Sequence, residues 1–254
     1  MDNKNIVYFV GAGPGDIDLI TVKGRKILSL ADVVIYAGSL VNKEHLTYCK
    51  EGVSIYNSAS MNLNQVIDVI KKANLENKKV VRLHTGDPSI YGAIKEQMDE
   101  LDKFDIDYEI IPGVSSFTAA AAVIKKEFTL PNVTQTVILT RIEGRTPVPE
   151  REKIKNLAKI GASMALFLSV TMIDKVVEEL KLGYGKNVPV AVIYKATWTD
   201  EKIIIGTLDN ISEKVKNEKV ERTAQILVGD FIDCEYEKSL LYDESFTHMF
   251  REGK

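Results

Sequence analysis

The chain has 254 residues, and its 33 Lys and Arg against 36 Asp and Glu leave a net charge of -3. This balance, with 45% hydrophobic residues, is typical of a globular protein and argues against nucleic-acid binding through bulk positive charge. Two well-separated cysteines, Cys49 and Cys234, and three scattered histidines argue against a disulfide scaffold and against a bound metal. No apolar run approaches the ~18 residues of a membrane span, and the N-terminal run is too short for a signal peptide, so we expect a cytoplasmic protein.

Short apolar runs alternate with helical apolar stripes through the first half of the chain. The runs predict strands at 6–10, 31–36, 79–83 and 108–111, and the stripes predict helices at 19–30, 66–73 and 90–101. Strands and helices in this order predict βαβ crossovers and a parallel sheet.

The organisation changes after Gly113. A thin helix with four consecutive alanines is expected at 115–124, strands at 136–140, 164–169, 190–194, 202–206 and 225–228, and helices near 150–158, 173–180 and 210–217. The connection between 190–194 and 202–206 is too short for a helical crossover, so these strands are expected to be antiparallel. The predicted fold is therefore α/β with two α/β domains: residues 1–113 with a parallel sheet and residues 114–232 with a mixed sheet, followed by a charged tail at 233–254.

The first predicted strand is followed by the glycine-rich loop Gly11-Ala12-Gly13-Pro14-Gly15-Asp16. A loop of this kind suggests a dinucleotide site, in which glycines let a pyrophosphate approach a helix N-terminus. The spacing is G-x-G-x-G, however, Pro14 lacks an N–H donor, and the second strand ends in Tyr36 without an acidic residue for a ribose. These features argue against a classical NAD or FAD site. The alternative, a tight strand–helix turn, needs some of the three glycines but hardly all of them.

Two more motifs follow predicted strands, at the edge of a parallel sheet where ligands bind. In the first, at 84–92, helix capping alone would explain Asp87 as N-cap and Pro88 as first helical residue, but it would not explain Tyr91. In the second, at 112–116, Ser115 or Ser116 would cap the next helix. The sequence offers no G-x-S-x-G arrangement and no suitable histidine for a serine nucleophile.

Residues 140–149, here called the arginine loop, contain Arg141, Arg145 and two prolines after a strand of the second half. A solvated loop is the usual interpretation of such a stretch. At the carboxyl end of a strand, the same arginines could instead hold a carboxylated ligand through bidentate contacts.

Taken together, the motifs resemble the tetrapyrrole methyltransferase superfamily, in which two α/β domains bind S-adenosylmethionine in the cleft between them. The resemblance rests on VGAGPGD at 10–16, HTGDPSIYG at 84–92, PGVSS at 112–116 and AQILVG at 224–229, and it covers residues 6–232. Within the superfamily, IYAGSLVN at 35–42, FTAAAA at 117–122, LPNVTQTVILTRIEGRTPVPE at 130–150 and ALFLSV at 165–170 resemble the C11-methyltransferases of precorrin-4 or cobalt-precorrin-4 in vitamin B12 synthesis. One departure is Ala37, which stands where many members carry an acidic residue.

The resemblance implies a set of cofactor contacts and a homodimer. The implied contacts are Pro14, Thr85, Gly86, Asp87, Ile90, Ser115, Ser116, Leu168 and Ala196. A sulfonium methyl is already activated, and its transfer to carbon is an in-line displacement that depends on alignment, so we expect no covalent intermediate and no catalytic triad.

The implied substrate is a cyclic tetrapyrrole that carries acetate and propionate carboxylates. Arg82, Arg141 and Arg145 are the candidate carboxylate anchors, and Tyr36 and Tyr91 are candidates to pack on the macrocycle. Two alternatives stay open: a superfamily member that methylates another tetrapyrrole carbon, diphthine or RNA, and a non-catalytic nucleotide- or tetrapyrrole-binding module. The modest net charge weighs against RNA.

Overall fold

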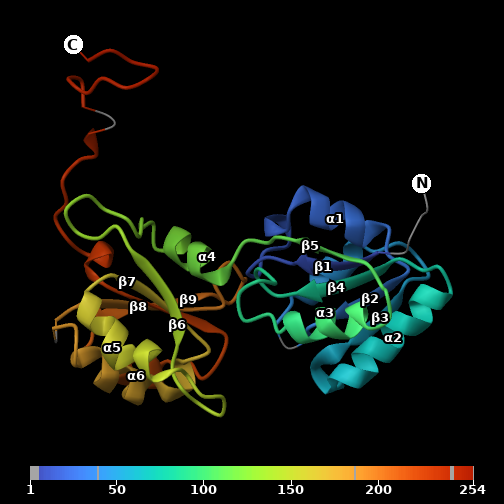
Figure 1. Cartoon of the computed structure of the whole chain (residues 1–254). Helices are drawn as coiled ribbons and strands as arrows, with labels where there is room; N and C mark the ends of the chain where they lie inside the picture. Colours follow the sequence, from blue (N-terminus) through green and yellow to red (C-terminus); the bar gives the residue numbers. More distant parts are fainter. Residues whose placement is uncertain (1–5, 39, 186, 241–242, 254) are drawn as a thin grey trace. The chain divides into compact units, whose positions relative to one another are not determined.

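The computed structural model describes residues 6–38, 40–185, 187–240 and 243–253. The chain divides into two compact units, one formed by Met1–Ala119 with Thr197–Thr199 and the other by Ala120–Ala196 with Asp200–Lys254 (Figure 1). The division falls within helix α4 (Ser116–Val123), slightly beyond the boundary that we place after Gly113. In the described part of the chain, no helix combines the length and the apolar character needed to cross a membrane.

The first unit is built on a parallel sheet, as the sequence predicts. Its strands are β1 (Val7–Gly11), β2 (Val33–Tyr36), β3 (Ser54–Asn57), β4 (Val80–His84) and β5 (Tyr108–Ile111). Their order is β3-β2-β4-β1-β5, and each neighbouring pair is parallel. Strand β3 is not predicted from the sequence. All its residues are exposed at the sheet edge, so the strand has no apolar pattern.

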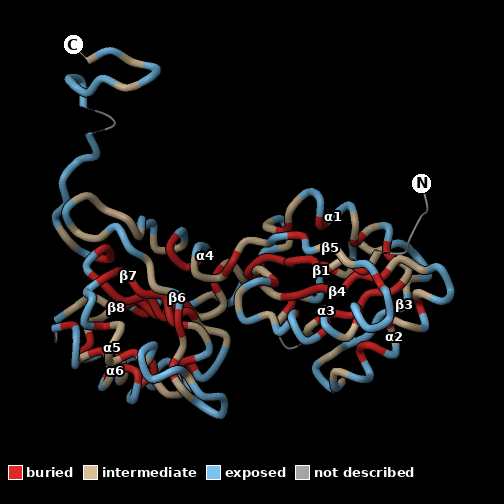
Figure 2. Tube along the Cα trace, viewed as in Figure 1, coloured by how far each residue is buried: buried red, intermediate tan, exposed pale blue. Residues whose placement is uncertain are grey.

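Helices cover both faces of this sheet. They are α1 (Val22–Ser29), α2 (Leu63–Leu75) and α3 (Lys95–Asp102), with short 3-10 turns η1 (Ile17–Leu19), η2 (Lys43–Tyr48) and η3 (Ser58–Ser60). Helices α2 and α3 pack on one core with alternate strand residues such as Phe9 and Ile35, while α1 and η2 pack on the opposite core with Val10 and Val34. Strands β1, β2 and β4 are almost wholly buried between these layers (Figure 2).

The helix expected at 90–101 is shorter than predicted. It begins at Lys95, and residues 88–91 form a turn instead. Tyr91 and Ala93 have left-handed backbone angles (φ 54° and 49°), which a continuous helix does not allow. The expectation that Asp87 caps a helix is therefore wrong, although Ile94 and Leu101 of the apolar stripe are buried as predicted.

The second unit contains the predicted mixed sheet. Its strands are β6 (Val137–Arg141), β7 (Ser163–Phe167), β8 (Pro189–Tyr194), β9 (Lys202–Thr207) and β10 (Ala224–Val228), in the order β6-β7-β10-β8-β9. Strands β6 and β7 are parallel, whereas the pairs β7–β10, β10–β8 and β8–β9 are antiparallel. The predicted antiparallel pairing of β8 and β9 is thus confirmed.

Three helices and several 3-10 turns complete the second unit. They are α5 (Ile154–Leu157), α6 (Ile173–Lys181) and α7 (Ile211–Asn217), with η4 (Glu150–Glu152), η5 (Ala158–Ile160), η6 (Val170–Met172) and η7 (Asp230–Ile232). The helix predicted at 150–158 is therefore broken into η4, α5 and η5. The three helices pack on a single core with alternate residues of the central strands, such as Leu166, Val192 and Ile226.

Candidate functional site

The order of the strands in the first unit creates a switch point between β1 and β4, which are neighbours. The chain leaves β1 through α1 on one face of the sheet and leaves β4 through α3 on the other face. In open α/β sheets, ligands bind at the carboxyl ends of the strands at such a point. The glycine-rich loop follows β1 and the 84–92 motif follows β4, so the topology alone places both motifs at the expected binding edge.

Glycines hold three loops together at this edge. The Gly86 N–H donates to the Gly13 carbonyl at 2.8 Å, and the Ala12 N–H donates to the His84 carbonyl at 2.7 Å. A Cβ on Gly11 would lie 2.6 Å from the Gly86 oxygen, and a Cβ on Gly113 would lie 2.2 Å from the same oxygen. Gly11 and Gly113 therefore pack directly on the backbone of Gly86, because a side chain on either would collide with the Gly86 oxygen. These three residues are here called the glycine cluster.

Asp87 joins the second and third motifs. Its Oδ1 accepts a hydrogen bond from the Ser89 N–H at 2.8 Å, and its Oδ2 accepts one from the Gly113 N–H at 2.9 Å. Both carboxylate oxygens thus orient backbone at the binding edge. Because a carboxylate offers about four lone-pair sites, Asp87 can still accept a hydrogen bond from a ligand.

The three motif segments of the binding edge lack the cationic side chains that hold phosphate groups. Segments 11–16, 84–92 and 112–117 contain neither lysine nor arginine. Burial, with a smaller contribution from the charge of Arg82, lowers the pKa of His84 to about 3, so this histidine is neutral at pH 7. In the glycine-rich loop, the Ala12 and Gly13 N–H groups already donate to β4 and its following loop. This arrangement argues against a dinucleotide and suits a ligand without phosphates.

Seven of the nine predicted cofactor contacts come from the three loops at this edge. Pro14 follows the Gly13–Gly86 bridge directly. A Cβ on Gly86 would lie 3.7 Å from both Ser115 Cα and Ser116 N, so these motifs are in contact. The first unit therefore brings together the segments that carry Pro14, Thr85, Gly86, Asp87, Ile90, Ser115 and Ser116.

The other two predicted contacts, Leu168 and Ala196, belong to the second unit. Leu168 directly follows β7, is 65% exposed, and has a left-handed backbone (φ 52°). Ala196 is buried, and its neighbours Lys195 and Thr197 also have left-handed backbones (φ 48° and 71°). Such backbone angles in residues other than glycine cost energy and cluster at functional sites.

The predicted substrate residues of the first unit differ in accessibility. Tyr36 and Arg82 are buried, at 6% and 7% exposed, whereas Tyr91 is 45% exposed. Arg82 Nε donates to Gln97 Oε1 at 3.0 Å and Nη1 donates to the Ile35 carbonyl at 3.1 Å, and burial lowers its pKa to about 10. Two of the Arg82 donors therefore bind neighbouring protein groups, which argues against a role as a freely accessible carboxylate anchor.

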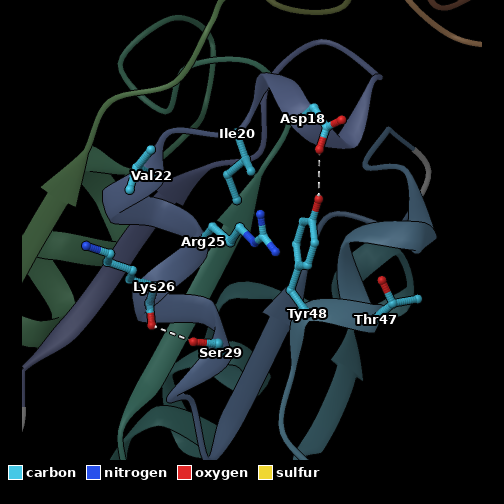
Figure 3. A pocket seen from close by; sticks show the side chains of 8 residues that line it. All are labelled: Asp18, Ile20, Val22, Arg25, Lys26, Ser29, Thr47 and Tyr48. Carbon is cyan, nitrogen blue, oxygen red and sulfur yellow. Dashed lines mark hydrogen bonds between the residues drawn. The ribbon is translucent and has the colours of Figure 1, made fainter.

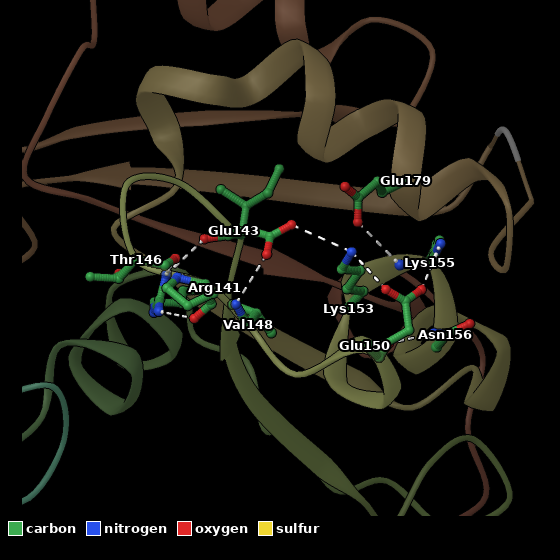
Figure 4. A network of polar contacts seen from close by, with 11 residues as sticks. Arg141, Glu143, Thr146, Val148, Glu150, Lys153, Lys155, Asn156 and Glu179 are labelled. Carbon is green, nitrogen blue, oxygen red and sulfur yellow. Dashed lines mark hydrogen bonds and ion pairs between the residues drawn. The ribbon is translucent and has the colours of Figure 1, made fainter.

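The two arginines of the arginine loop also differ, although both are predicted from sequence as carboxylate anchors. Arg141 Nη1 donates to the carbonyls of Ile142 and Thr146 at 3.2 Å each, and its Nη2 donates to the Pro147 carbonyl at 2.9 Å (Figure 4). Arg145 is exposed. The guanidinium of Arg141 thus shapes the loop, and that of Arg145 is available to a ligand.

Charged side chains hold the far end of the arginine loop. Lys153 Nζ lies 3.5 Å from Glu143 Oε2 and 2.7 Å from Glu150 Oε2, and Lys155 Nζ lies 3.0 Å from Glu150 Oε1 (Figure 4). Glu143 also accepts a hydrogen bond from the Val148 N–H at 3.3 Å. The Lys155–Glu150 pair is solvent-exposed and the contacts of Lys153 and Glu143 are partly exposed, so salt should screen them in part.

A pocket of about 580 Å³ lies elsewhere in the first unit (Figure 3). It is lined by Asp18, Ile20, Val22, Arg25, Lys26, Ser29, Thr47 and Tyr48. The Arg25 guanidinium lies 4.5 Å from the centre of the Tyr48 ring, and the Tyr48 hydroxyl lies 3.4 Å from Asp18 Oδ1. No residue of the predicted site lines this pocket, so it is distinct from the binding edge.

Comparison with known proteins identifies the family. A sequence model of tetrapyrrole (corrin/porphyrin) methylases matches residues 6–212. The chain is 60% identical to a cobalt-precorrin-4 C(11)-methyltransferase of Methanocaldococcus jannaschii, over 100% of this chain and 98% of that protein. It is 45% identical to a precorrin-4 C(11)-methyltransferase of Pseudomonas aeruginosa, over 98% of this chain and 99% of that protein. An X-ray structure of a cobalt precorrin-4 methyltransferase matches 91% of this chain and 97% of its own, with a TM-score of 0.89 at 48% identity. The chain therefore belongs to the tetrapyrrole (corrin/porphyrin) methylase family.

Proposed function

We propose that this protein transfers the methyl group of S-adenosylmethionine to C11 of cobalt-precorrin-4 or precorrin-4. The observation that carries the proposal is the 60% identity, over both full lengths, to a cobalt-precorrin-4 C(11)-methyltransferase. The alternative, methylation of another tetrapyrrole, has weaker support. A relative named uroporphyrinogen-III C-methyltransferase is only 34% identical, over 89% of this chain.

The binding edge of the first unit suits S-adenosylmethionine. This cofactor has no phosphate and carries a positive sulfonium, and the three edge segments supply no lysine or arginine that would repel it. Hydroxyl groups of Thr85, Ser115 and Ser116 and the carboxylate of Asp87 can hydrogen bond to its ribose and amino acid parts. We propose Leu168 and Ala196 as further contacts, on the strength of the family resemblance.

The chemistry requires alignment more than functional-group catalysis. The bound cofactor supplies an activated methyl group, and orientation of two reactants is worth up to about 7–11 kcal/mol. In this chain, the glycine cluster and Asp87 fix the three loops before any ligand binds, because their contacts are made within the protein. The role of these residues is therefore to hold the cofactor in one orientation.

On the substrate side, we propose Arg145 as a carboxylate anchor and Tyr91 as a packing surface for the macrocycle. Both side chains are exposed, and a guanidinium can form two parallel hydrogen bonds with a carboxylate. Arg141 is assigned the indirect role of shaping the arginine loop around Arg145. Tyr36 and Arg82 are assigned a supporting role beneath the edge, since both are buried.

Calorimetric titration with S-adenosylhomocysteine and with NAD tests the cofactor proposal. We expect saturable binding of S-adenosylhomocysteine and none of NAD. Binding of NAD with no binding of S-adenosylhomocysteine would refute the proposal. The family resemblance also supports a homodimer, which sedimentation equilibrium of the purified protein would test.

A further inference from the structure

Two residues far away in the sequence contact the glycine-rich loop. Thr197–Thr199 belong to the first unit, although the preceding and following residues do not. The indole Nε1 of Trp198 donates a hydrogen bond to the Pro14 carbonyl at 2.9 Å. The Asp16 N–H donates one to the Thr197 hydroxyl at 3.0 Å. Two backbone polar groups of the loop therefore depend on this short segment.

Trp198 also explains why residue 15 is glycine. A Cβ on Gly15 would lie 2.1 Å from Trp198 Cδ1 and 2.3 Å from its Nε1. By contrast, a Cβ on Gly11 would meet the backbone of Gly86 and Gly113, and a Cβ on Gly13 would meet the Leu19 carbonyl. The third glycine, which a strand–helix turn alone hardly needs, is required because the indole packs directly on it.

The backbone of this segment is held in an uncommon conformation. Thr197 has φ 71°, and a left-handed backbone is a genuine outlier for a β-branched residue. Such a conformation persists only where surrounding contacts determine it. The contacts of Thr197 and Trp198 with the glycine-rich loop are of this kind, so the segment and the loop fix each other.

We propose that Thr197 and Trp198 are positioning residues that hold Pro14 and Gly15 in the conformation that binds the cofactor. The inference rests on the proposed function, in which Pro14 contacts S-adenosylmethionine. The Gly13–Gly86 bridge fixes only the start of the loop. From Pro14 to Asp16, the loop is held by Trp198, by Thr197 and by Asn42, whose Nδ2 donates to the Gly15 carbonyl at 3.1 Å. Without Trp198, the Pro14 carbonyl loses its indole donor and Gly15 loses its covering ring.

The first test removes the hydrogen bond and the ring separately. Trp198→Phe keeps a ring on Gly15 but has no donor for Pro14, and Trp198→Ala removes both. One hydrogen bond corresponds to about fivefold in affinity, so Trp198→Phe should weaken S-adenosylhomocysteine binding about fivefold and Trp198→Ala more. The KM for S-adenosylmethionine should rise by similar factors, while kcat at saturating cofactor changes less than twofold. Phe104→Ala, which removes a half-exposed ring contacted by Lys71, is the matched control and should leave affinity unchanged.

The second test is a double-mutant cycle between Gly15 and Trp198, with Thr197→Val as an additional variant. Gly15→Ala alone should weaken cofactor binding at least tenfold, because its Cβ collides with the indole. In the Trp198→Ala background, the same change should cost less than twofold, because the collision is gone. Thr197→Val keeps the side-chain shape and loses the hydroxyl acceptor, and it should weaken binding about threefold.

The outcomes separate this inference from the proposed function. Wild-type protein that fails to bind S-adenosylhomocysteine would refute the proposed function. Wild-type protein that binds it, together with Trp198 and Thr197 variants of unchanged affinity, would overturn the positioning role alone. If Trp198→Ala unfolds, then Trp198→Phe and Thr197→Val still decide the question.

Discussion

The binding edge of the first unit and the arginine loop of the second unit both follow strand ends, but different forces hold them. At the binding edge, backbone groups bond to backbone groups, and the glycine cluster excludes side chains from the contact. In the arginine loop, the contacts come from the guanidinium of Arg141 and from partly exposed ion pairs of Lys153 with Glu143 and Glu150. The first arrangement fixes one shape, and the second leaves a charged, solvated surface that single substitutions can alter. This difference fits a rigid site for a shared methyl donor and an adjustable site for a particular substrate.

The largest expected effect is at the glycine cluster. Gly113→Ala places a Cβ 2.2 Å from the Gly86 oxygen, and both partners are backbone, so neither can move without shifting a loop. We expect a loss of about 3 kcal/mol in the free energy of unfolding, measured by urea denaturation. Gly185→Ala is the control, because a Cβ there meets nothing within 4 Å, and it should be nearly neutral. Equal stabilities of the two variants would show that the binding edge is not tightly packed.

Asp87→Asn should have the next largest effect. Both carboxylate oxygens accept backbone N–H bonds, and an amide turns one acceptor into a donor that faces the Ser89 or Gly113 N–H. The expected loss is about 1–3 kcal/mol of stability, with weaker binding of S-adenosylhomocysteine in calorimetry. Asp68→Asn, on the exposed face of α2, is the matched control. A melting temperature that stays at the wild-type value would show that Asp87 does not tie the two loops together.

Acid should destabilise the first unit through His84. Burial lowers the pKa of His84 from its usual 6.5 to about 3, so the folded protein binds fewer protons than the unfolded chain between these values. The free energy of unfolding therefore keeps its full value above pH 6.5. Below pH 6.5, His84 lowers it by about 1.4 kcal/mol for each pH unit. His84→Gln should reduce the dependence of the free energy of unfolding on pH, measured by denaturation at pH 7.5 and 5.5. His45, whose pKa is also lowered by burial, contributes in the same direction and remains in both proteins. An unchanged slope in His84→Gln would contradict the assignment.

The arginine loop should respond to substitution in function more than in stability. Arg145→Ala removes the exposed guanidinium that we propose as the carboxylate anchor, so the substrate KM should rise about threefold to tenfold while the melting temperature and the cofactor affinity stay unchanged. Arg141→Ala removes three contacts with loop carbonyls, so it should also make the loop more sensitive to limited proteolysis. Arg141→Lys should restore little, because a point charge cannot span carbonyls of two or three residues. An unchanged substrate KM in both alanine variants would show that the arginine loop is not part of the substrate site.

Prediction from sequence succeeds here where the signal is local. Apolar runs give the strands β1, β4 and β5, and the short connection between β8 and β9 gives their antiparallel pairing. Prediction fails where the outcome depends on tertiary partners. Nothing in the sequence around Asp87 shows that Gly113, which is 26 residues away, needs its second oxygen.

In the candidate site too, local motifs are predictable from the sequence and tertiary contacts are not. The motifs at 10–16, 84–92 and 112–116 are recognisable in the sequence, and the parallel sheet brings them to one edge. Other features depend on where side chains lie in the fold: the different contacts of Arg141 and Arg145, the burial of Arg82, and the contact of Trp198 with Pro14. Residue type and spacing carry no information on these points.

Methyl transfer to C11 can be measured in a single-turnover experiment with isotope-labelled cofactor. The purified protein would be incubated with S-adenosylmethionine carrying a ¹³C methyl group and with cobalt-precorrin-4 or precorrin-4, and the product analysed by mass spectrometry and ¹³C NMR. We predict one labelled methyl per product molecule, attached to C11, and one equivalent of S-adenosylhomocysteine. A label on another carbon, or no transfer by a protein that binds S-adenosylhomocysteine, would show that the protein is not a C11-methyltransferase.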